Sequence, residues 1–310
     1  AVTVANTSDN AEEDFFGTVE TALESGASAP LINEFDDDDS KFWVDYYDST
    51  IQNLAGICSI RDEFVHNAIE KLGLPIIMKT TTEGYDGKGQ FVLRKPEDAS
   101  ACWAEIGNRE LIAEAFVPFI REISVIGCRN ENGDIKVWPM TENIHHEGIL
   151  RYSLYPAHGF SAEKQAKAEG YIEQIASSLD YVGTITLELF ETEDNLIANE
   201  VAPRVHNSGH WSIEGAITSQ FRNHMLAVTG QNITATESLF PAAAMINVIS
   251  DEGPTAAGKG MTETYVHSYG KEARTARKLG HVTITAKSSD ERDAKISQLE
   301  GLIPNGVWQK

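Results

Sequence analysis

Short apolar runs separated by polar turns dominate the chain from residue 74 onward. The first two runs, LPIIMK and GQFVLRK, flank a glycine-rich turn. Runs of about four to eight residues bounded by turn residues are typical of β-strands. We therefore predict strands over both runs and over five later ones, which are ELIAEAFV, REISVIGCRN, GDIKVWPMTEN, GTITLELFE and NLIANEVAP.

Helical spacing of apolar residues occurs in three segments. The segment RDEFVHNAIEKLG, residues 61–73, ends on Gly73, which is a favourable residue to stop a helix. A longer helix is predicted over residues 161–181, where Ser161 can cap the first turn. A third is predicted between Ser219 and Gly230. The apolar stripe of the long helix comprises Ala168, Ile172, Ile175, Ala176 and Leu179.

The overall pattern predicts an α+β protein with more than one lobe, because 310 residues exceed what one compact core fills. Residues 1–60 form an unassigned acidic segment, which we interpret as a remnant of an N-terminal domain. Residues 61–140 are expected to form a small sheet lobe, and residues 141–240 a larger mixed lobe. The strand-like runs AAAMINVIS, TETYVHSYG and LGHVTITA predict a small β-rich unit over residues 241–310.

Composition and charge argue against several classes of partner. A net charge of −22 argues against nucleic acid as a partner, because a duplex binder needs a basic face. No apolar run reaches membrane-spanning length, and the first residues do not resemble a signal peptide. The cysteines Cys58, Cys102 and Cys128 are far apart, which fits a reducing compartment. We therefore expect a cytoplasmic protein with no membrane partner.

One hairpin carries the strongest chemical signal. Glu188 and Glu200 are equidistant from Asp194 in the polar turn ETEDN, so an antiparallel hairpin centred there would oppose them. Like charges directly opposite each other destabilise a sheet unless a cation lies between them. Two carboxylates and the amide of Asn199 suit magnesium, with manganese as a substitute. The alternative is a register shifted by one residue, or a pair that is simply exposed to solvent.

The glycine-rich turn GYDGKGQ, residues 84–90, joins one strand to another, so it is not a P-loop. Its glycines would let backbone amides approach phosphate oxygens, while Lys79 and Lys88 supply positive charge. A flap over a nucleotide would have this composition. An ordinary flexible hairpin with a surface lysine is the alternative, and the carboxylate hairpin downstream favours the nucleotide.

Six motifs, running in order from about residue 74 to the C-terminus, resemble the 5-(carboxyamino)imidazole ribonucleotide synthases, which are ATP-grasp ligases of purine biosynthesis. The most specific of them is EVAPRVHNSGHW followed by TSQF. The resemblance implies an ATP-grasp fold, ATP as cofactor, and carboxylation of aminoimidazole ribonucleotide by bicarbonate through carboxyphosphate. The motifs are GYDGKGQ, AEAFVPFIREIS, TENIHHEGI, ANEVAPRVHNSGHW, EGAITSQFRNH and ARKLGHV.

The resemblance also implies roles for individual residues. Lys79 would contact the ATP phosphates, Glu122 the ribose and His145 the nucleotide, with residues 84–90 as the flap and residues 114–117 around the adenine. Glu188 and Glu200 would bind the magnesium ion. The implied nucleotide and ligand-binding residues are Lys79, Gly84, Tyr85, Gly87, Gly89, Gln90, Glu114, Ala115, Phe116, Val117, Glu122, His145, Asn199 and Arg277.

Five further residues are implied in catalysis: Asp86, Lys88, Arg204, His206 and Lys278. Asp86 would hold the amine of the ribonucleotide. Arg204 and His206 would position bicarbonate or carboxyphosphate, and Lys278 would grip the ribose phosphate. Members of the family are commonly dimeric, so a homodimer is the expected assembly.

Two features depart from the family pattern. The GGGQLG-type turn of the usual front domain is absent, and residues 81–83 are Thr, Thr and Glu where basic residues and a glycine are usual. A fragment or a diverged paralogue would explain both, with the ATP half better preserved than the substrate half. The rival functions are therefore a ligase of the formate-dependent glycinamide ribonucleotide transformylase type and a non-catalytic nucleotide-binding paralogue.

Overall fold

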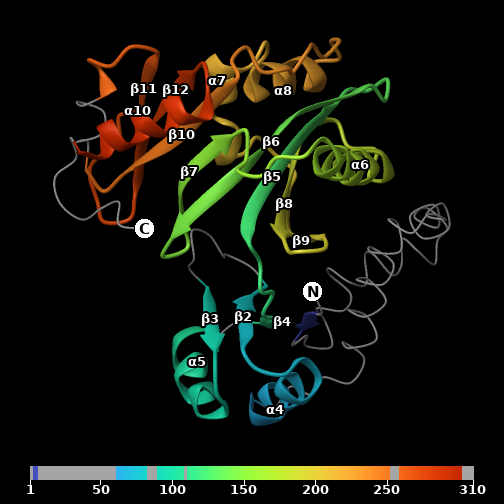
Figure 1. The fold of residues 1–310 in the computed structure, drawn as a ribbon. Helices are drawn as coiled ribbons and strands as arrows, with labels where there is room; N and C mark the ends of the chain where they lie inside the picture. The colour runs from blue at the N-terminus through green and yellow to red at the C-terminus, as the bar shows by residue number, and fades with distance from the viewer. Residues whose placement is uncertain (1–2, 6–60, 82–88, 108–109, 252–257, 302–310) are drawn as a thin grey trace. The chain divides into compact units, whose positions relative to one another are not determined.

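The computed structural model describes residues 3–5, 61–81, 89–107, 110–251 and 258–301 of the chain. The chain divides into two compact units, residues 1–118 and 119–310 (Figure 1). Each unit has its own antiparallel sheet and its own buried core. Residues 119–140, which the sequence pattern assigns to the small lobe, pair with strands of the second unit. None of the helices in the described ranges is long and apolar enough to cross a membrane.

The first unit is built on a four-stranded sheet in the order β1-β4-β2-β3. Its strands are β1 (Thr3–Ala5), β2 (Ile76–Thr80), β3 (Gln90–Leu93) and β4 (Leu111–Ala115). Helices α4 (Arg61–Leu72) and α5 (Ala99–Ile106) pack on this sheet, and a short 3₁₀ turn η2 (Pro96–Asp98) precedes α5. The core between them consists of Val65, Ala68, Ile76, Met78, Leu93, Cys102, Ile106, Leu111 and Ala113.

Alternation along β2 determines which face each side chain occupies. Ile76 and Met78 are fully buried against the helices, whereas the Lys79 side chain retains 30% of its exposure on the other face. The facing ends of β2 and β3 stay paired one step beyond Lys79 and Gln90, because the Thr80 amide donates to the Gly89 carbonyl at 2.7 Å, and Gly89 has φ of +73°. At the other end of the unit, α4 stops as predicted, with Gly73 at φ +72°.

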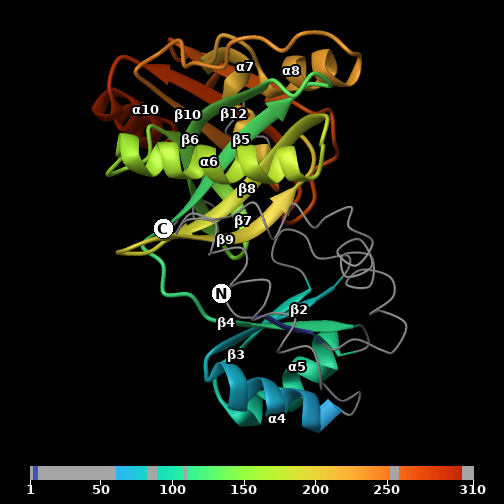
Figure 2. The same ribbon diagram turned by 90° about the vertical axis from the view of Figure 1, so that its right-hand side faces the viewer.

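The second unit is built on an eight-stranded sheet in the order β11-β12-β10-β7-β6-β5-β8-β9 (Figures 1 and 2). All neighbouring strands are antiparallel. The strands are β5 (Arg121–Arg129), β6 (Ile135–His146), β7 (Ile149–Tyr155), β8 (Gly183–Glu191), β9 (Leu196–Ala202), β10 (Ala242–Ile249), β11 (Thr264–Ser268) and β12 (Lys278–Ala286).

Helices cover both faces of this sheet. Helix α6 (Ala162–Ser178) packs on β5, β6 and β8, and helix α8 (Gln220–Val228) packs on β5 and β8 (Figure 2). Gly127 of β5 faces Ile172 of α6, while its neighbour Ile126 contacts Gly209 in the 3₁₀ turn η3 (Asn207–Gly209). The helix starts are as predicted: Ser161 and Ser219 each accept a hydrogen bond from a backbone amide of the first turn.

The apolar stripe of α6 is shorter than predicted. Ala168, Ile172 and Ala176 are buried, but Leu179 keeps 57% of its exposure. Leu179 is the residue at which the helix ends, and the chain turns away there through Asp180, which has φ of +46°. The helical period therefore applies only up to Ser178, and the prediction for Leu179 was wrong.

The C-terminal strands are not a separate sheet. Strand β10 pairs with β7, so β10, β12 and β11 extend the sheet that begins with β5–β9. Helix α10 (Ser289–Gly301) packs on β10 and β12, where Ile296 and Leu299 join the apolar core. A very short helix, α7 (Ser212–Gly215), lies against β12 (Figure 1).

Two residues near the start of β12 adopt left-handed backbone conformations. Ser250 has φ of +69° and Ala276 has φ of +62°. They face each other across the loop ends, where the Ala276 amide donates to Ser250 Oγ at 3.0 Å and the Ser250 amide donates to the Arg277 carbonyl at 3.0 Å. A residue with a Cβ is strained in this conformation, so Ala276 carries a local cost just before Arg277 and Lys278.

Replacing Ala276 with glycine is therefore expected to stabilise the protein. Removal of the Cβ relieves a strain of about 1 to 2 kcal/mol, offset in part by the entropy that glycine adds to the unfolded chain, which leaves a gain of roughly 0.5 to 1 kcal/mol. Urea unfolding of the A276G variant measures this gain. The matched control is Ala273→Gly in the same loop, because Ala273 has no left-handed φ and its replacement should give no gain.

Candidate functional site

The two glutamates of the β8–β9 hairpin are direct cross-strand partners, as predicted. The turn itself is centred one half-residue earlier than expected, because the Thr192 amide donates to the Asn195 carbonyl at 2.9 Å and Leu189 pairs with Ala198. Continued regularly, that register would oppose Glu188 to Asn199. A bulge at this point leaves Asn199 unpaired and shifts the partner of Glu188 to Glu200.

The bulge brings two carboxylates to the same face of the sheet at one place. The Glu188 side chain keeps only 15% of its exposure, whereas Glu200 is exposed. Burial raises the pKa of Glu188 to about 7, and the charges of Glu200 and Glu122 add to this rise against the opposing effect of His145. Without a cation, the Glu188 carboxyl is therefore only partly ionised near neutral pH.

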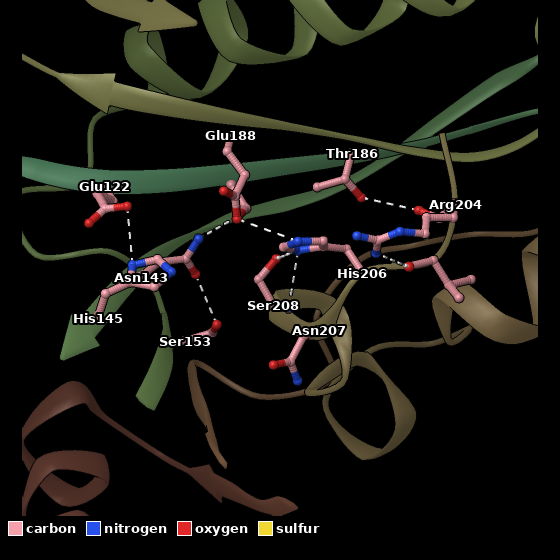
Figure 3. A network of polar contacts seen from close by, with 12 residues as sticks. Glu122, Asn143, His145, Ser153, Thr186, Glu188, Arg204, His206, Asn207 and Ser208 are labelled. Atoms are coloured by element: carbon pink, nitrogen blue, oxygen red, sulfur yellow. Dashed lines mark hydrogen bonds and ion pairs between the residues drawn. The ribbon is translucent and has the colours of Figure 1, made fainter. Parts of the chain in front are cut away.

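His145 and Glu122 form an ion pair beside these carboxylates (Figure 3). They come from adjacent strands, β6 and β5, and His145 Nδ1 lies 3.1 Å from Glu122 Oε2. Burial acts to lower the pKa of His145, but the hydrogen bond and charge of Glu122, with the charge of Glu188, raise it overall. Two residues that the sequence assigned to the nucleotide site are thus in contact, and both influence the pKa of Glu188.

His206 faces Glu188 from the loop after β9 (Figure 3). Its Nε2 lies 3.5 Å from Glu188 Oε1. Its Nδ1 accepts from the Ser208 amide at 3.3 Å and contacts Ser208 Oγ at 2.8 Å, so the neutral ring carries its proton on Nε2. Burial lowers the pKa of His206 to about 3, with further lowering by the charges of Arg204 and Lys278. The ring is therefore a neutral hydrogen-bond donor directed at Glu188.

Gln220 holds the backbone of His206 in place. Its Oε1 accepts from the His206 amide at 2.9 Å, and its Nε2 donates to the His206 carbonyl at 2.6 Å. Gln220 is fully buried at the start of α8, where its backbone N–H donates to Ser212 Oγ at 3.0 Å. Sequence reasoning missed this residue, although it lies within the TSQF segment that marks the family.

Arg204 precedes His206 and is exposed, with its guanidinium donating to the Val205 carbonyl at 3.1 Å. The charges of Arg204 and Lys278 both act on the pKa of His206, so both cations lie in the neighbourhood of its ring. Arg277 donates from its guanidinium to the Glu272 carbonyl at 3.3 Å. The second unit thus brings together most of the predicted residues of its hairpin, of the PRVHNSGH loop and of β12.

A second polar cluster, also missed, lies beside Glu122 and Glu188, since Asn143 is the cross-strand partner of Glu122 and Ser124 is that of Glu188. Asn143 of β6 donates to Ser124 Oγ on β5, and Ser153 Oγ on β7 donates to Asn143 Oδ1 at 2.9 Å (Figure 3). All three side chains are buried. They align along a row across three strands, which no local sequence pattern could reveal.

The first unit holds the remaining predicted residues. Lys79 Nζ pairs with Glu114 Oε2 at 2.6 Å across β2 and β4, so the residue predicted for phosphate is adjacent to the segment predicted for adenine. That segment continues through Ala115 and Val117, and Phe116 is 43% exposed. Gly89 and Gln90 lie at the start of β3. The predicted flap residues Gly84, Tyr85, Asp86, Gly87 and Lys88 lie outside the described residues.

The carboxylate pair fits a divalent cation in its donor chemistry. Glu188 and Glu200 offer hard oxygen atoms on one face, and Asn199 adds an amide in the adjoining bulge. Within the described part of the chain, no group of three or more His, Cys, Asp or Glu side chains is arranged to hold a metal ion. Two carboxylates alone match a magnesium ion that takes its other oxygens from water and from substrate phosphates.

The chain is similar in sequence to two protein families and to enzymes of one kind. Residues 52–221 match the ATP-grasp domain family, and residues 243–295 match the phosphoribosylaminoimidazole carboxylase C-terminal domain. The N5-carboxyaminoimidazole ribonucleotide synthase of Pseudomonas aeruginosa is 42% identical over 236 residues, which cover 76% of this chain and 64% of that protein. The chain therefore spans less than two thirds of the length of this relative.

Solved structures agree with the sequence comparison. The N5-carboxyaminoimidazole ribonucleotide synthetase of Thermus thermophilus superimposes with a TM-score of 0.73 at 40% identity, over 80% of this chain and 67% of that one. The Aspergillus clavatus enzyme, described in complex with ADP and 5-aminoimidazole ribonucleotide, has a TM-score of 0.74 at 26% identity, over 79% and 66%. Because the ATP-grasp match alone covers more than half of the chain, this protein belongs to the ATP-grasp family, and the C-terminal match together with 40% identity over 67% of the Thermus thermophilus chain places it in the branch of the N5-carboxyaminoimidazole ribonucleotide synthases.

Proposed function

We propose that the chain carries out ATP- and bicarbonate-dependent carboxylation of 5-aminoimidazole ribonucleotide. ATP would phosphorylate bicarbonate to carboxyphosphate, with release of ADP. The exocyclic amine of the ribonucleotide would then attack the carboxyl carbon, lose a proton and release phosphate. The opposed Glu188 and Glu200 side chains carry this proposal. Such a pair needs a cation between its members, and phosphoryl transfer from ATP uses a divalent metal ion bound to the phosphates. The names of the relatives support the choice of substrate.

The carboxylate pair would hold the divalent cation. Glu188 and Glu200, with Asn199 in the bulge, are the residues that would bind magnesium, or manganese in its place. Magnesium bound there would neutralise charge on the phosphates of ATP. The raised pKa of Glu188 has a direct consequence for binding, because the proton on this carboxyl must leave before its oxygens can serve as ligands.

The His206 loop would hold the carboxyl group in transfer. Arg204 supplies a permanent positive charge for bicarbonate or carboxyphosphate, whereas His206 is neutral and can donate a hydrogen bond from Nε2. The ring is neutral because the pKa of its imidazolium form lies far below neutral pH, so His206 can orient an oxyanion by a hydrogen bond but is not an acid that transfers a proton. Lys278, with Arg277 beside it, would bind the ribose phosphate.

Nucleotide contacts are proposed for each unit by itself. In the first unit, Lys79 would contact the phosphates and residues 114–117 would surround the adenine. In the second, Glu122 would hold the ribose and His145 would contact the nucleotide. In the glycine-rich turn, Asp86 would hold the substrate amine while Tyr85 and Lys88 close over the phosphates. Exclusion of water is the expected purpose of this turn, because carboxyphosphate is lost quickly to hydrolysis.

An assay of ADP release distinguishes this function from its rivals. Turnover with bicarbonate that rises when aminoimidazole ribonucleotide is added supports the proposal. Turnover that requires formate and glycinamide ribonucleotide would instead assign a ligase of the transformylase type. Nucleotide binding without any turnover would indicate a non-catalytic paralogue. A cytoplasmic location and a homodimer remain predictions, which fractionation and sedimentation would test.

The first prediction concerns the exposed member of the pair. Glu200→Gln removes one anionic ligand and should abolish magnesium-dependent ADP release, while circular dichroism shows an intact fold. The matched control is Glu193→Gln at the exposed turn of the same hairpin, which should keep normal turnover. If E200Q retains the activity of the control, Glu200 does not bind the metal.

The second prediction concerns the buried member and needs no substrate. Since the pKa of Glu188 is raised to about 7 in the folded state, that state binds an extra proton between about pH 4.5 and 7, and stability is lost as pH rises through this window. Glu188→Gln cannot titrate. Compared with wild type in metal-free buffer, it should gain on the order of 2 to 3 kcal/mol between pH 5 and 8. A stability difference that is the same at both pH values would contradict the buried, opposed carboxylates.

A further inference from the structure

Three polar residues form a row across the C-terminal strands. Asn247 of β10 is the cross-strand partner of His281 of β12, and His281 is the partner of His267 of β11. Cross-strand partners project to the same face of a sheet, so the three side chains are neighbours. Asn247 and His281 are fully buried. Burial of such groups costs free energy unless they have hydrogen-bond partners, so the row needs an explanation.

A second set of three residues meets this row. Asn207, His210 and Glu214 are three and four residues apart along η3 and α7, which places them on one side of a helical path. We refer to Asn207, His210 and Glu214 as the turn set, and to Asn247, His281 and His267 as the strand row. Each member of the turn set contacts one member of the strand row.

The first contact is a pair of amides. Asn247 Nδ2 donates to Asn207 Oδ1 at 2.7 Å, and Asn207 Nδ2 donates back to Asn247 Oδ1 at 3.0 Å. Asn247 also donates to the Leu150 carbonyl at 2.8 Å, which ties the pair to β7. Because Asn247 is fully buried, water does not compete for these two reciprocal hydrogen bonds, and together they fix the position of the Asn207 side chain.

The other two contacts involve the histidines. The rings of His210 and His281 meet edge to face with centroids 4.8 Å apart, and His281 stacks on His267 at 4.4 Å. His267 Nε2 lies 2.7 Å from Glu214 Oε1. Tyr269 completes the set, with its hydroxyl 2.8 Å from His281 Nδ1. Burial lowers the pKa values of His210 and His281, so these two rings are neutral where they touch.

The turn set begins one residue after His206. The same turn that carries Asn207 also carries Ser208, whose amide and hydroxyl contact His206 Nδ1 (Figure 3). Gln220 holds the His206 backbone on one side, and Asn207 attaches the next residue to β10 on the other. The direction of His206 Nε2 toward Glu188 therefore depends on where the C-terminal strands place the turn.

We propose that the strand row Asn247, His281 and His267 is a positioning device for the reaction, which sets the location of the 204–214 loop without touching a substrate. The expected effect on kinetics rests on the proposed function. The expected effect on the position of the 204–214 loop rests on the contacts alone. The residues act through Arg204 and His206, so their loss should affect the carboxyl and ribonucleotide site. The first unit, which holds Lys79 and Glu114, should be unaffected.

The test compares Asn247→Leu and His281→Leu with the matched control Thr283→Val. Thr283 lies on the same face of β12 and is equally buried, and among the described residues its hydroxyl has no hydrogen-bond partner, so T283V makes a similar polar-to-apolar change outside the row. Hydrogen–deuterium exchange of the 204–214 loop is measured without any ligand. We expect exchange in this loop to be about tenfold faster in both row variants than in T283V, with exchange in β5 and β8 unchanged.

Kinetics supply the second measurement. Both row variants should raise KM for aminoimidazole ribonucleotide roughly tenfold while KM for ATP stays within about twofold of T283V. His281→Asn, which retains a polar group near the Nδ1 position, should recover most of the loss. Should the leucine variants fail to fold, Asn247→Asp, which keeps shape and acceptor but loses the donor, is compared with T283V in the same way.

The outcomes separate the two proposals. Exchange in the 204–214 loop that matches T283V overturns the positioning role, whatever the enzyme catalyses. A parallel rise in KM for ATP and for the ribonucleotide also overturns it, because that pattern indicates a general structural loss. Absence of ribonucleotide-stimulated turnover in the wild-type protein overturns the proposed function, while faster exchange in the row variants would still support the positioning of the loop.

Discussion

The second unit is organised around the repulsion between two carboxylates held opposite each other on neighbouring strands. Glu188 and Glu200 share one face of the β8–β9 hairpin, and a sheet gains nothing from placing them together. The surroundings reduce this repulsion without removing it. Burial leaves Glu188 only partly ionised near neutral pH, and His206 faces it as a neutral donor instead of a cation. A divalent ion would remove the repulsion that the protein leaves in place.

Positioning of the neighbouring loop comes from two directions. Gln220 clamps the backbone of His206 from α8, and the amide pair of Asn207 and Asn247 attaches the following residue to β10. These contacts connect the part of the chain that matches the ATP-grasp domain to the part that matches the C-terminal domain. Because β10 continues the same sheet through β7, residues 119–221 of the ATP-grasp match and the whole C-terminal match belong to the second unit.

Local patterns in the sequence were sufficient for most of the strands, for the caps at Ser161 and Ser219, and for the glutamate pair. The pairing was predicted from symmetry about Asp194, yet the turn is centred earlier and only the bulge at Asn199 restores the pair. A bulge follows from twist and packing, which short sequence windows do not contain. Leu179 is a different error. Its spacing fits the helical period of the apolar stripe, but the helix ends at this residue and its side chain is exposed.

The parts that escaped prediction depend on contacts between distant residues. Gln220 and Asn247 lie 14 and 41 residues from His206 in the chain, so neither is identifiable as a support before the fold is known. Strand β7 and helices α5 and α10 were also not predicted, and the C-terminal strands were expected to stand apart although they extend the main sheet. Sheet membership is decided by pairing across the fold, which composition and periodicity do not encode.

The central claim is that one divalent ion is shared by Glu188 and Glu200 when nucleotide binds. Anomalous scattering from manganese, in crystals grown with a non-hydrolysable ATP analogue, locates such an ion directly. A manganese peak is expected between the two carboxylates, within coordination distance of an oxygen atom of each. A manganese ion bound to the nucleotide but contacting neither glutamate would contradict it.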